Sequence, residues 1–403
     1  MKKQHHNYQL SLITTTNHYQ LITITDKYAT TRLCYKLLDD KYLDKNGKVK
    51  RDLKFKLSFP EFGIVDSKIP AKEGEKFDTY LFLPEGEDRK GEGGLRTKGY
   101  FKFSYKKGIW DKGYGIKDKK EWWIVDEDDN PVEKVNLPLT SYPLSLNYLP
   151  LITIITVVYN GEKYLEETIQ SVINQTYPNV EYIIIDGGST DGTLDIIKKY
   201  EDYIDYWVSE KDKGIYDAMN KGLKVAKGDY IAILNADDYY KKNAVQSNIE
   251  CILKSTKDYA IANVEYTDGN IIKPIIPLEK KIYQEMPYPH VSALIPMKIY
   301  KDIGFFDTNF KIAGDHDMAV RIILKGYQYC YNNKIIATLE KGGISDSLTS
   351  NFESCKVAVK NGKNLLLAYA TLYKQILKIK IIKFLPKRIA YVLKKLKRSR
   401  FAN

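Results

Sequence analysis

The chain has 403 residues, of which 43% are apolar and 12% aromatic, and its mean hydropathy is −0.40. This composition excludes a largely disordered protein, because 33 Tyr, 13 Phe and 4 Trp provide ample apolar surface for folded cores. The length predicts two or three domains. No apolar run reaches the ~18 residues of a spanning helix, and the start, MKKQHHNYQLSL, lacks the core of a signal peptide, so we expect a cytoplasmic protein.

The positive charge is concentrated near the carboxyl end. Of the formal net charge of +12, eleven units come from Lys and Arg in residues 374–400, which contain no Asp or Glu. The rest of the chain is nearly neutral, and since a nucleic-acid-binding domain needs a cationic face on its folded part, we expect no nucleic-acid partner. One interpretation of the tail is peripheral association with an anionic membrane surface, on the inner face of the cell membrane. The alternative is a solvated tail that packs on the body, or an oligomer contact.

The four cysteines are scattered singly along the chain. Cys34, Cys251, Cys330 and Cys355 form no CxxC pair. This spacing suggests neither a disulfide framework nor a zinc site. We expect the four side chains to be small, buried apolar groups.

Residues 1–150 are predicted to form a strand-rich region. Aromatic and charged residues alternate in YFKFSY (100–105) and EWWIVDEDDNPVEKV (121–135), with turn signals between such runs. This pattern is typical of short antiparallel strands, and a linker is expected at 140–150. Two interpretations are open for Trp110, Trp122 and Trp123, which are suited to stacking on sugar rings or to filling the core between strands.

Residues 151–345 alternate strand and helix patterns. Four apolar runs have the character of buried strands: 151–158, 180–186, 204–209 and 229–235. After the first run, four apolar residues recur at the spacing of one helix face: Leu165, Ile169, Val172 and Ile173. This alternation predicts one α/β domain with a mostly parallel sheet flanked by helices. Residues 346–403 are predicted to be a helical, basic extension.

Polar and acidic residues follow the strand-like runs. Asp186 ends the second run, Asp212 follows the third, and Asn-Ala-Asp-Asp (235–238) follows the fourth. In an open α/β sheet, ligands bind beyond the carboxyl ends of the strands, so a cation or a sugar-like polyol is the expected guest. The chain contains no GxxxxGK[ST] motif and no GxGxxG loop at these ends, which counts against P-loop NTPases and NAD enzymes.

Each acidic candidate has a functional and a purely structural interpretation. Asp186 precedes a Gly-Gly turn, where its carboxylate suits a nucleobase N–H or a ribose hydroxyl, or a turn or helix cap. Asp237 and Asp238 offer the oxygen ligands that Mg²⁺ or Mn²⁺ takes, although exposed acids at strand ends are common. A helix pattern begins at about Asp315, whose carboxylate suits a general base or a helix cap. His290, just before another apolar run, is similarly ambiguous.

Three stretches in order, 151–200, 209–240 and 289–322, resemble the inverting glycosyltransferases of family 2, which have the GT-A fold. The similarity covers nearly half of the chain, and the motifs are highly specific as a set. GEGGLRTKGYFK, from Gly91, is also similar to the segment that leads into this domain in some bacterial polysaccharide transferases.

The resemblance implies roles for individual residues. Asp237 matches the metal-binding carboxylate of the family's DxD motif, at the nucleotide, with Asp238 as a helper. Asp315 falls where the family places its catalytic base. The resemblance also implies a set of nucleotide-binding residues: Thr156, Tyr159, Asp186, Asp212 and Lys221.

Four positions depart from the family pattern. They are Asn235 for the first Asp of DxD, Gly187 for the second Asp of DDGS, Met219 for the Arg of ARN, and Gly314 for the Glu that often precedes the base. With Met219 in place of the arginine, Lys221 is the expected substitute near the diphosphate.

These observations predict a metal-dependent inverting glycosyltransferase, with Mn²⁺ or Mg²⁺ as cofactor. It would transfer a hexose from a nucleotide-sugar donor, with UDP favoured, to a glycan or lipid-linked oligosaccharide in surface polysaccharide synthesis of the lipopolysaccharide or capsule type. Two alternatives are a noncatalytic scaffold that binds sugar nucleotides or glycans, and a nucleotidyltransferase that releases pyrophosphate.

Overall fold

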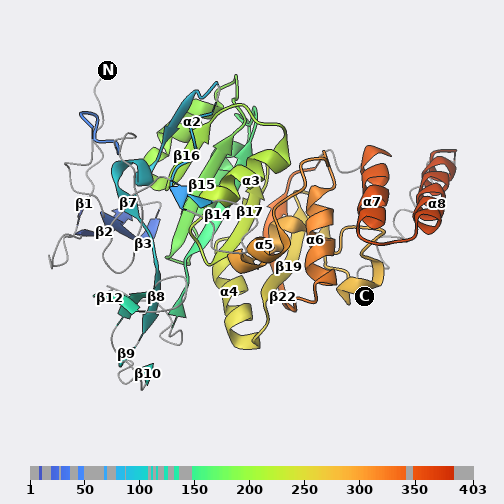
Figure 1. Cartoon of the computed structure of the whole chain (residues 1–403). Coiled ribbons are helices and arrows are strands. Elements are labelled where there is room, and N and C mark those ends of the chain that lie inside the picture. Colours follow the sequence, from blue (N-terminus) through green and yellow to red (C-terminus); the bar gives the residue numbers. More distant parts are fainter. Residues whose placement is uncertain are drawn as a thin grey trace.

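The computed structural model has a central α/β body between amino-terminal strands and two carboxyl-terminal helices (Figure 1). The structure describes residues 9–10, 20–26, 29–36, 44–49, 68–69, 79–86, 88–107, 110–111, 115–116, 122–125, 131–135, 148–341 and 348–384. The α/β body occupies most of the longest described stretch, and it contains every candidate site residue named above.

A six-stranded sheet forms the centre of the body. Its four inner strands are parallel and lie in the order β17 (Tyr230–Asn235), β14 (Ile152–Val158), β15 (Val180–Asp186) and β16 (Tyr206–Ser209). Antiparallel strands close the two edges, β21 (Ile295–Pro296) beside β17 and β6 (Gly91–Gly93) beside β16. The prediction of a mostly parallel sheet is confirmed, since the four apolar runs of the sequence form the four inner strands.

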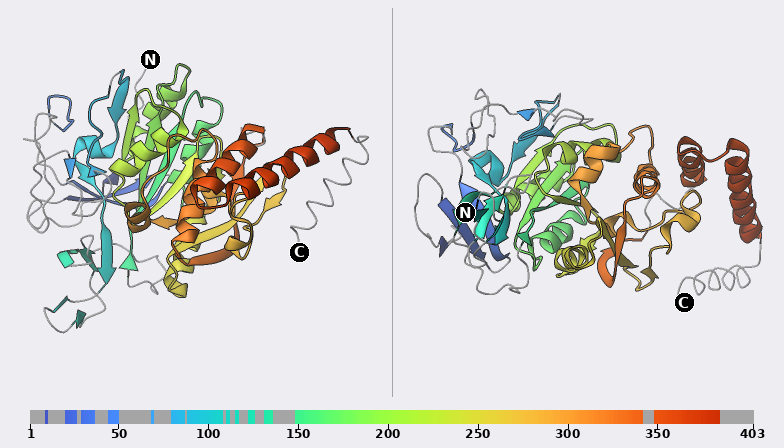
Figure 2. Two further views of the ribbon diagram at one scale, coloured as in Figure 1. Left: turned by 45° about the vertical axis from the view of Figure 1, so that its right-hand side comes forward. Right: turned by 60° about the horizontal axis from the view of Figure 1, so that its bottom comes forward.

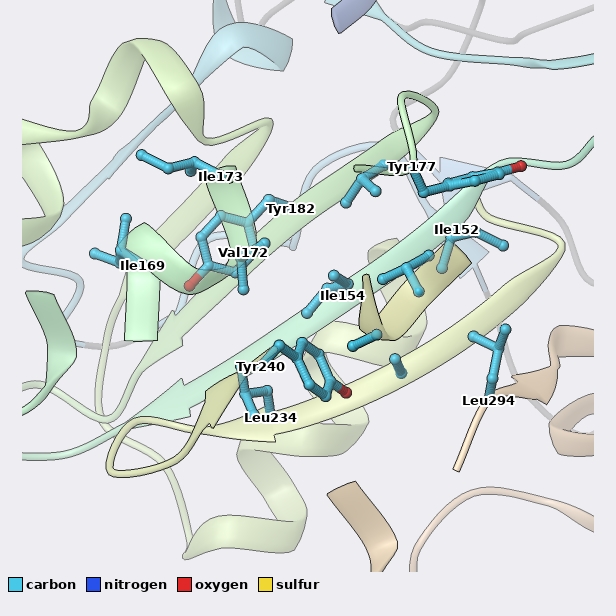
Figure 3. Close-up of a cluster of buried hydrophobic side chains, with 14 of the residues drawn as sticks. Ile152, Ile154, Ile169, Val172, Ile173, Tyr177, Tyr182, Leu234, Tyr240 and Leu294 are labelled. Carbon is cyan, nitrogen blue, oxygen red and sulfur yellow. The ribbon is translucent and has the colours of Figure 1, made fainter. Parts of the chain in front are cut away.

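The inner strands are apolar because both faces of the sheet are covered. On one face, Ile154 belongs to a cluster with Ile169 and the other apolar residues of α1 (Leu165–Ile173), and Figure 3 shows this cluster. On the opposite face, Ile155 packs against α3 (Ile215–Val225). All four residues predicted for the helix face of α1 are buried.

A second sheet completes the body. Its four strands lie in the order β18 (Tyr239–Tyr240), β22 (Tyr329–Leu339), β19 (Tyr259–Tyr266) and β20 (Ile271–Ile272). The remaining helices of the body are α2 (Thr193–Lys199), α4 (Ala244–Ser255), α5 (Met297–Ile303) and α6 (Gly314–Leu324). The predicted helix at Asp315 is therefore confirmed as α6.

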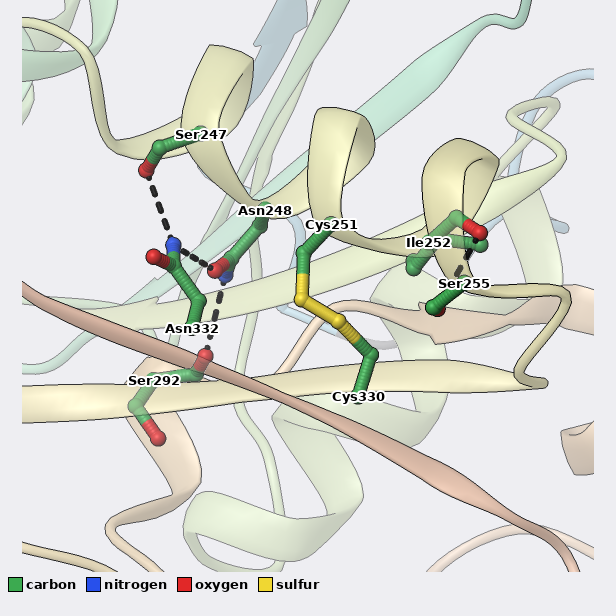
Figure 4. Close-up of a disulfide and its surroundings, with 8 residues drawn as sticks. All are labelled: Ser247, Asn248, Cys251, Ile252, Ser255, Ser292, Cys330 and Asn332. Carbon is green, nitrogen blue, oxygen red and sulfur yellow. Dashed lines mark hydrogen bonds between the residues drawn. A yellow bond between two sulfur atoms is a disulfide. The ribbon is translucent and has the colours of Figure 1, made fainter.

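The expectation that all four cysteines are unpaired is wrong for two of them. Cys251 of α4 and Cys330 of β22 form a disulfide, with their Cα atoms 6.1 Å apart (Figure 4). The two residues are 79 positions apart, and only the packing of α4 against β22 brings them together, so no local spacing could reveal the pair. Cys355 is free and buried, as expected.

Residues 81–107, which we call the edge segment, precede the predicted α/β domain in sequence but pack into it. The segment contains β6 and a short 3₁₀ helix, Leu95–Lys98. The backbone N–H groups of the first two residues of this helix donate hydrogen bonds to the carbonyls of Ile204 and Asp205, just before β16. Four of its apolar residues join the core cluster of the sheet: Leu81, Phe101, Phe103 and Tyr105. Residues ahead of position 151 therefore share the core of the α/β body.

The amino-terminal region also contains the predicted antiparallel strands. One sheet consists of β12 (Pro131–Val135), β11 (Trp122–Val125), β8 (Ser104–Lys107) and β13 (Tyr148–Leu149), and another of β1 (Gln9–Leu10), β2 (Gln20–Asp26), β3 (Ala29–Lys36) and β7 (Tyr100–Phe101). Two short pairs are β4 (Lys68–Ile69) with β5 (Thr79–Tyr80), and β9 (Trp110–Asp111) with β10 (Gly115–Ile116). The side chains of Trp110 and Trp122 lie outside the described residues, so a sugar-binding role stays a prediction.

The carboxyl-terminal extension is helical, as predicted, over the residues that the structure describes. Helix α7 (Leu348–Lys360) lies next to α6, and α8 (Leu365–Phe384) packs against α7 and projects from the body (Figure 2). Within the described residues, none of the helices combines the length and apolar character needed to cross a membrane. The tail beyond α8 lies outside the described residues.

Candidate functional site

The carboxyl ends of the four inner strands lie along one edge of the sheet, and the candidate residues follow them. Asp186 ends β15 level with Val158 of β14, while Asn235 ends β17 level with Val157. Since neighbouring strands lie ~4.8 Å apart, these two ends are about 10 Å from each other across β14. A ligand about 10 Å long could therefore span the ends of both strands.

A pocket of about 730 Å³ opens at this edge, on the β16 side. It is lined by Asp88, Arg89, Lys90, Tyr159, Gly187, Gly188, Lys211 and Asp212. The volume falls within the range of about 300–1,000 Å³ that small-molecule sites occupy. Two residues predicted to bind nucleotide, Tyr159 and Asp212, line it, whereas its residues from the edge segment carry no motif and were missed in the sequence.

Two other predicted nucleotide-binding residues are fully buried instead. The hydroxyl of Thr156 accepts a hydrogen bond from the Tyr182 hydroxyl inside the sheet. Asp186 accepts hydrogen bonds from the backbone N–H and hydroxyl of Ser189 and from the hydroxyl of Ser209. Asp186 thus braces the turn after β15 and joins it to the end of β16, and neither residue lines the pocket.

The departure at Gly187 has a structural reason. A β-carbon on Gly187 would lie 2.5 Å from Oδ2 of Asp212 and 3.4 Å from Cδ2 of Tyr159. The carboxylate of Asp212 therefore occupies the space above the turn that a side chain at position 187 would take. Burial raises the pKa of Asp212, and the N–H of Gly214 and the charge of Lys221 oppose that shift.

Lys221, the expected substitute at the diphosphate, is engaged within the protein. Its Nζ lies 2.9 Å from Oε1 of Glu210 and donates to the backbone carbonyl of Lys211. Arg89 of the edge segment pairs with the other carboxylate oxygen of Glu210 at 2.6 Å. Glu210 therefore ties α3 and the edge segment to the loop after β16, which carries Asp212.

The loop after β17 presents one exposed and one buried carboxylate. Asp237 is exposed, whereas Asp238 is buried and accepts hydrogen bonds from the backbone N–H of Glu340 (3.3 Å) and from Nδ2 of Asn235 (3.4 Å). Burial, and then the charge of Asp237, raises the pKa of Asp238 to about 7. Oδ1 of Asn235 is buried and has no hydrogen-bond partner among the described residues.

A row of side chains connects this loop to the start of α6. Nδ2 of Asn235 lies 3.3 Å from Nε2 of His290, and Nδ1 of His290 lies 3.4 Å from Oδ2 of Asp315. We call Asp238, Asn235, His290 and Asp315 the contact row. The amide donates to Asp238 and to the His290 ring, so Nδ1 carries the ring proton that faces Asp315. His290, ambiguous in the sequence, therefore links the two predicted parts of the site.

Asp315 is partly exposed and held in its ionised form. Burial opposes ionisation, but the contact with His290 and the backbone N–H of His316 outweigh it and lower the pKa of Asp315 below its ordinary value. Conversely, Asp315 raises the pKa of His290 against the effect of burial. The side chain of Asp315 is 23% exposed, so a ligand can reach it.

The glycine before Asp315 also has a structural reason. A β-carbon on Gly314 would lie 2.8 Å from the ring of Tyr216, which is buried and stacks on Phe306. The hydroxyl of Tyr216 donates to the carbonyl of Ile312 at 2.5 Å and lies 3.1 Å from Oδ1 of Asp315. The ring of Tyr216 thus takes the space of a larger residue at 314, next to the carboxylate of Asp315.

The carboxyl-terminal extension supports the same helix start. Glu353 of α7 is buried and accepts backbone hydrogen bonds from Lys311, Ile312 and Ala313 at 2.7–2.9 Å. These residues form the turn that leads into α6. Helix α7, which lies beyond the predicted α/β domain in the sequence, therefore fixes the position of Asp315.

Comparison with known proteins identifies the class. The model of glycosyl transferase family 2 matches residues 153–306, which carry most of the strand ends described above. An uncharacterized glycosyltransferase of Rickettsia typhi is 31% identical over 51% of this chain and 67% of its own length. This chain is a glycosyltransferase. More particularly, it belongs to family 2, and the recognition from its motifs is confirmed.

Other relatives overlap this chain over shorter stretches. The putative teichuronic acid biosynthesis glycosyltransferase TuaG of Bacillus subtilis is 40% identical over 27% of this chain and 44% of its own length. The chain spans only 32% of the length of an uncharacterized glycosyltransferase of Rickettsia felis, which is 32% identical. This chain therefore spans less than half of the length of each of these two relatives.

Solved structures show more distant likeness. TarS of S. aureus in complex with UDP-GlcNAc aligns over 55% of this chain and 70% of that chain, with a TM-score of 0.45 and 20% identity. The mannosyltransferase PcManGT from Pyrobaculum calidifontis, in complex with GDP-Man and Mn²⁺, aligns over 64% and 81%, with a TM-score of 0.44 and 18% identity.

Proposed function

We propose that this glycosyltransferase is a metal-dependent, inverting hexosyltransferase. It moves the sugar of a nucleoside-diphosphate sugar, with UDP favoured, to a hydroxyl of a glycan or lipid-linked oligosaccharide during assembly of a surface polysaccharide. The observation that carries the proposal is the contact row, in which a partly exposed, ionised carboxylate lies two side chains away from the aspartates of the β17 loop. The similarity to TuaG, named for teichuronic acid biosynthesis, supports a surface polymer as the product.

The residues after β17 fit a hard divalent cation, Mn²⁺ or Mg²⁺. Asp237 exposes its carboxylate, Asp238 follows it in the loop, and Oδ1 of Asn235 is buried without a hydrogen-bond partner among the described residues. The described part of the chain contains no group of three or more His, Cys, Asp or Glu arranged to hold a metal. Few protein ligands are typical of such ions where substrate phosphates complete the shell. A cation bound there supplies positive charge for the departing diphosphate.

Asp315 is the proposed proton acceptor. As the acceptor hydroxyl forms a bond to the anomeric carbon, the bond from that carbon to the diphosphate oxygen breaks, and the hydroxyl proton passes to Asp315. His290 and the backbone N–H of His316 contact the two oxygens of the carboxylate, so its orientation is set before the acceptor arrives. A single in-line displacement inverts the anomeric configuration.

The substitution Asp315→Asn tests this proposal. We expect turnover to fall by about 10² to 10⁴-fold, the usual effect of losing a general base, while donor affinity is kept. Asp302→Asn is the matched control, because Asp302 pairs with Lys325 on the surface, away from the contact row. Turnover is measured as nucleoside diphosphate released from a panel of nucleotide sugars with Mn²⁺, and donor affinity by calorimetry.

Three results would contradict the proposal in different ways. Near-normal turnover of the Asp315→Asn variant removes Asp315 from the mechanism. Donor binding without turnover of any nucleotide sugar favours the noncatalytic scaffold. Release of pyrophosphate instead of a nucleoside diphosphate identifies a nucleotidyltransferase.

The extension beyond the body supports peripheral binding to an anionic membrane. One face of α8 packs on α7 through Ala368 and Leu372, whereas Leu366 (78% exposed) and Tyr373 (67% exposed) lie on an uncovered apolar face. Residues 374–400 add eleven positive charges and no negative ones. An apolar helix face joined to a basic segment suits the interface of an anionic bilayer. This arrangement would bring the enzyme to a lipid-linked acceptor.

Vesicle sedimentation tests the membrane proposal. The double substitution Leu366→Glu/Tyr373→Glu should abolish binding to phosphatidylglycerol vesicles, because it places charge on the apolar face. Ile271→Glu is the control, since Ile271 is an exposed apolar residue of β20, at a distance from α8 in the sequence. Equal binding by the double variant, or equal binding to phosphatidylcholine vesicles, would refute the proposal.

A further inference from the structure

The pocket on the β16 side has a wall that lies outside the part of the chain matched by the family model. Asp88, Arg89 and Lys90 line the pocket, although the family model begins only at residue 153. They reach it because β6 is antiparallel to β16, so the start of β6 lies at the carboxyl-end edge of the parallel strands. The backbone N–H of Lys90 donates to the carbonyl of Ser209, which fixes this wall to the end of β16.

The side chain of Lys90 crosses the pocket edge to the turn after β15. Its Nζ donates to the carbonyls of Gly188 and Ser189, at 2.8 and 2.9 Å. An ammonium group has three N–H donors, so one is left without a partner among the described residues. Lys90 is exposed, and this remaining donor is available to a ligand in the pocket.

An acceptor and an aromatic ring complete the pocket. Oδ1 of Asp212 accepts from the backbone N–H of Gly214, while Oδ2 lies above Gly187 and accepts no bond from any described residue. The ring of Tyr159 is 65% exposed and borders the same space above Gly187. A ring for stacking beside one acceptor and one donor is the arrangement that reads the edge of a nucleobase.

The position of the pocket indicates which part of a donor it takes. The β17 loop and Asp315, where the proposed reaction occurs, lie on the far side of β14 from the pocket. A nucleoside-diphosphate sugar whose diphosphate lies at the β17 loop would extend its base toward β15, β16 and the edge segment. The pocket is therefore at the base end of the donor.

We propose that Lys90 is a specificity-determining residue that, together with Asp212, selects a base with a ring N–H beside a carbonyl. Uracil and guanine present this pair, with the N–H donating to the carboxylate and the carbonyl accepting from the ammonium. Cytosine and adenine present an unprotonated ring nitrogen beside an amino group. The ring nitrogen would then face the carboxylate of Asp212, which is also an acceptor, and the amino group would face the ammonium of Lys90, which is also a donor. This inference rests on the proposed function and adds the nucleotide class and a residue outside the family domain.

Calorimetry on the full chain with Mn²⁺ tests the inference, using UDP, GDP, CDP and ADP. The wild type should bind UDP or GDP at least tenfold more tightly than CDP and ADP, and the comparison of the first two identifies the base. Lys90→Met should lower the affinity for the preferred nucleotide by about 10- to 100-fold and leave the affinities for CDP and ADP nearly unchanged. Lys90→Arg should retain most of the preference, because it keeps a cationic donor.

Lys98→Met is the control, because Lys98 belongs to the edge segment but pairs with Asp202 at the surface and does not line the pocket. It should leave all four affinities unchanged. In Asp212→Asn, the amide can donate to an unprotonated ring nitrogen, so the preference should move toward CDP. This shift in preference is a result that a merely structural role for the loop would not produce.

The outcomes separate this inference from the proposed function. If Lys90→Met lowers the affinities for all four nucleotides equally, Lys90 only supports the turn after β15. The inference then fails, while the proposal that the chain binds a nucleotide is kept. A wild-type preference for CDP or ADP also overturns the inference alone. If the wild type binds none of the four, both the inference and the proposed function fail.

Discussion

Arg96 is a deeply buried charge that joins the edge segment to the α/β body. Its side chain is 2% exposed, and Nη1 donates to the carbonyls of Leu81 and Val225 at 2.8 Å. Nη2 pairs with Glu181 of β15 at 2.5 Å. Removing the guanidinium while keeping apolar bulk, as in Arg96→Met, leaves the carboxylate of Glu181 buried without its cation.

The expected loss of stability is large. Removing one partner of a buried ion pair costs about 3–5 kcal/mol, because the other charge is left desolvated. The value should lie toward the lower end, since Thr153 and the backbone N–H of Lys227 still donate to Glu181. Lys98→Met is the control, because an exposed pair such as Lys98 with Asp202 contributes about 0–1 kcal/mol.

Urea unfolding followed by tryptophan fluorescence measures both variants. Trp207 is a suitable reporter because it is 3% exposed and pairs directly with Gly93 of the edge segment. The Arg96→Met variant should unfold at a clearly lower urea concentration than the wild type and Lys98→Met. A loss below about 1 kcal/mol would refute the claim that this ion pair holds the segment in the body.

Three further predictions concern the loop after β17, the disulfide and α7. Mn²⁺ affinity should fall as the pH drops from 8 to 6, because burial and then the charge of Asp237 raise the pKa of Asp238 to about 7 and the protonated acid cannot bind a cation; calorimetry at constant affinity across this range would contradict it. Cys251→Ser should lower the free energy of unfolding by about 4 kcal/mol, since the bond to Cys330 closes a loop with a sequence separation of 79, and equal stability of both forms in urea would oppose this. Glu353→Gln should reduce turnover by about 10- to 100-fold at unchanged donor affinity, because an amide cannot accept from all three backbone N–H groups before α6, and normal turnover would exclude this positioning role.

The α/β body was predictable because its signals are local. A strand covered on both faces must be apolar along its whole length. The apolar runs at 152–158 and 180–186 can therefore be recognised as strands from the sequence alone. The helix face of α1 is also read from neighbouring residues, and it is buried as its spacing requires. Parallel order then follows from the helices between the strands.

The resemblance of the segment from Gly91 indicated that it leads into the domain, but its burial within the body was not predictable because the signals for it are not local. GEGGLRTKGYFK contains glycines and basic residues, which in isolation indicate an exposed loop. In the structure, Arg96 and Lys102 are buried, and their partners Glu181 and Asp205 lie 85 and 103 positions away. A buried charge is tolerated only with its partner, so neither burial can be inferred before the two segments are brought together.

At the site, the types of residue were predictable from the sequence, but which of them face the pocket and which hold the fold together was not. A strand-end carboxylate such as Asp186 looks like a ligand contact in the sequence, and only the hydroxyls of Ser189 and Ser209 reveal that it also holds two strand ends together. The glycine at 187 looks like the loss of a functional acid, yet the carboxylate of Asp212 fills the space that it leaves. A side chain from the neighbouring strand end can thus occupy the space at a position that departs from a family pattern. Assigning such a role therefore requires the packing around the position as well as its motif.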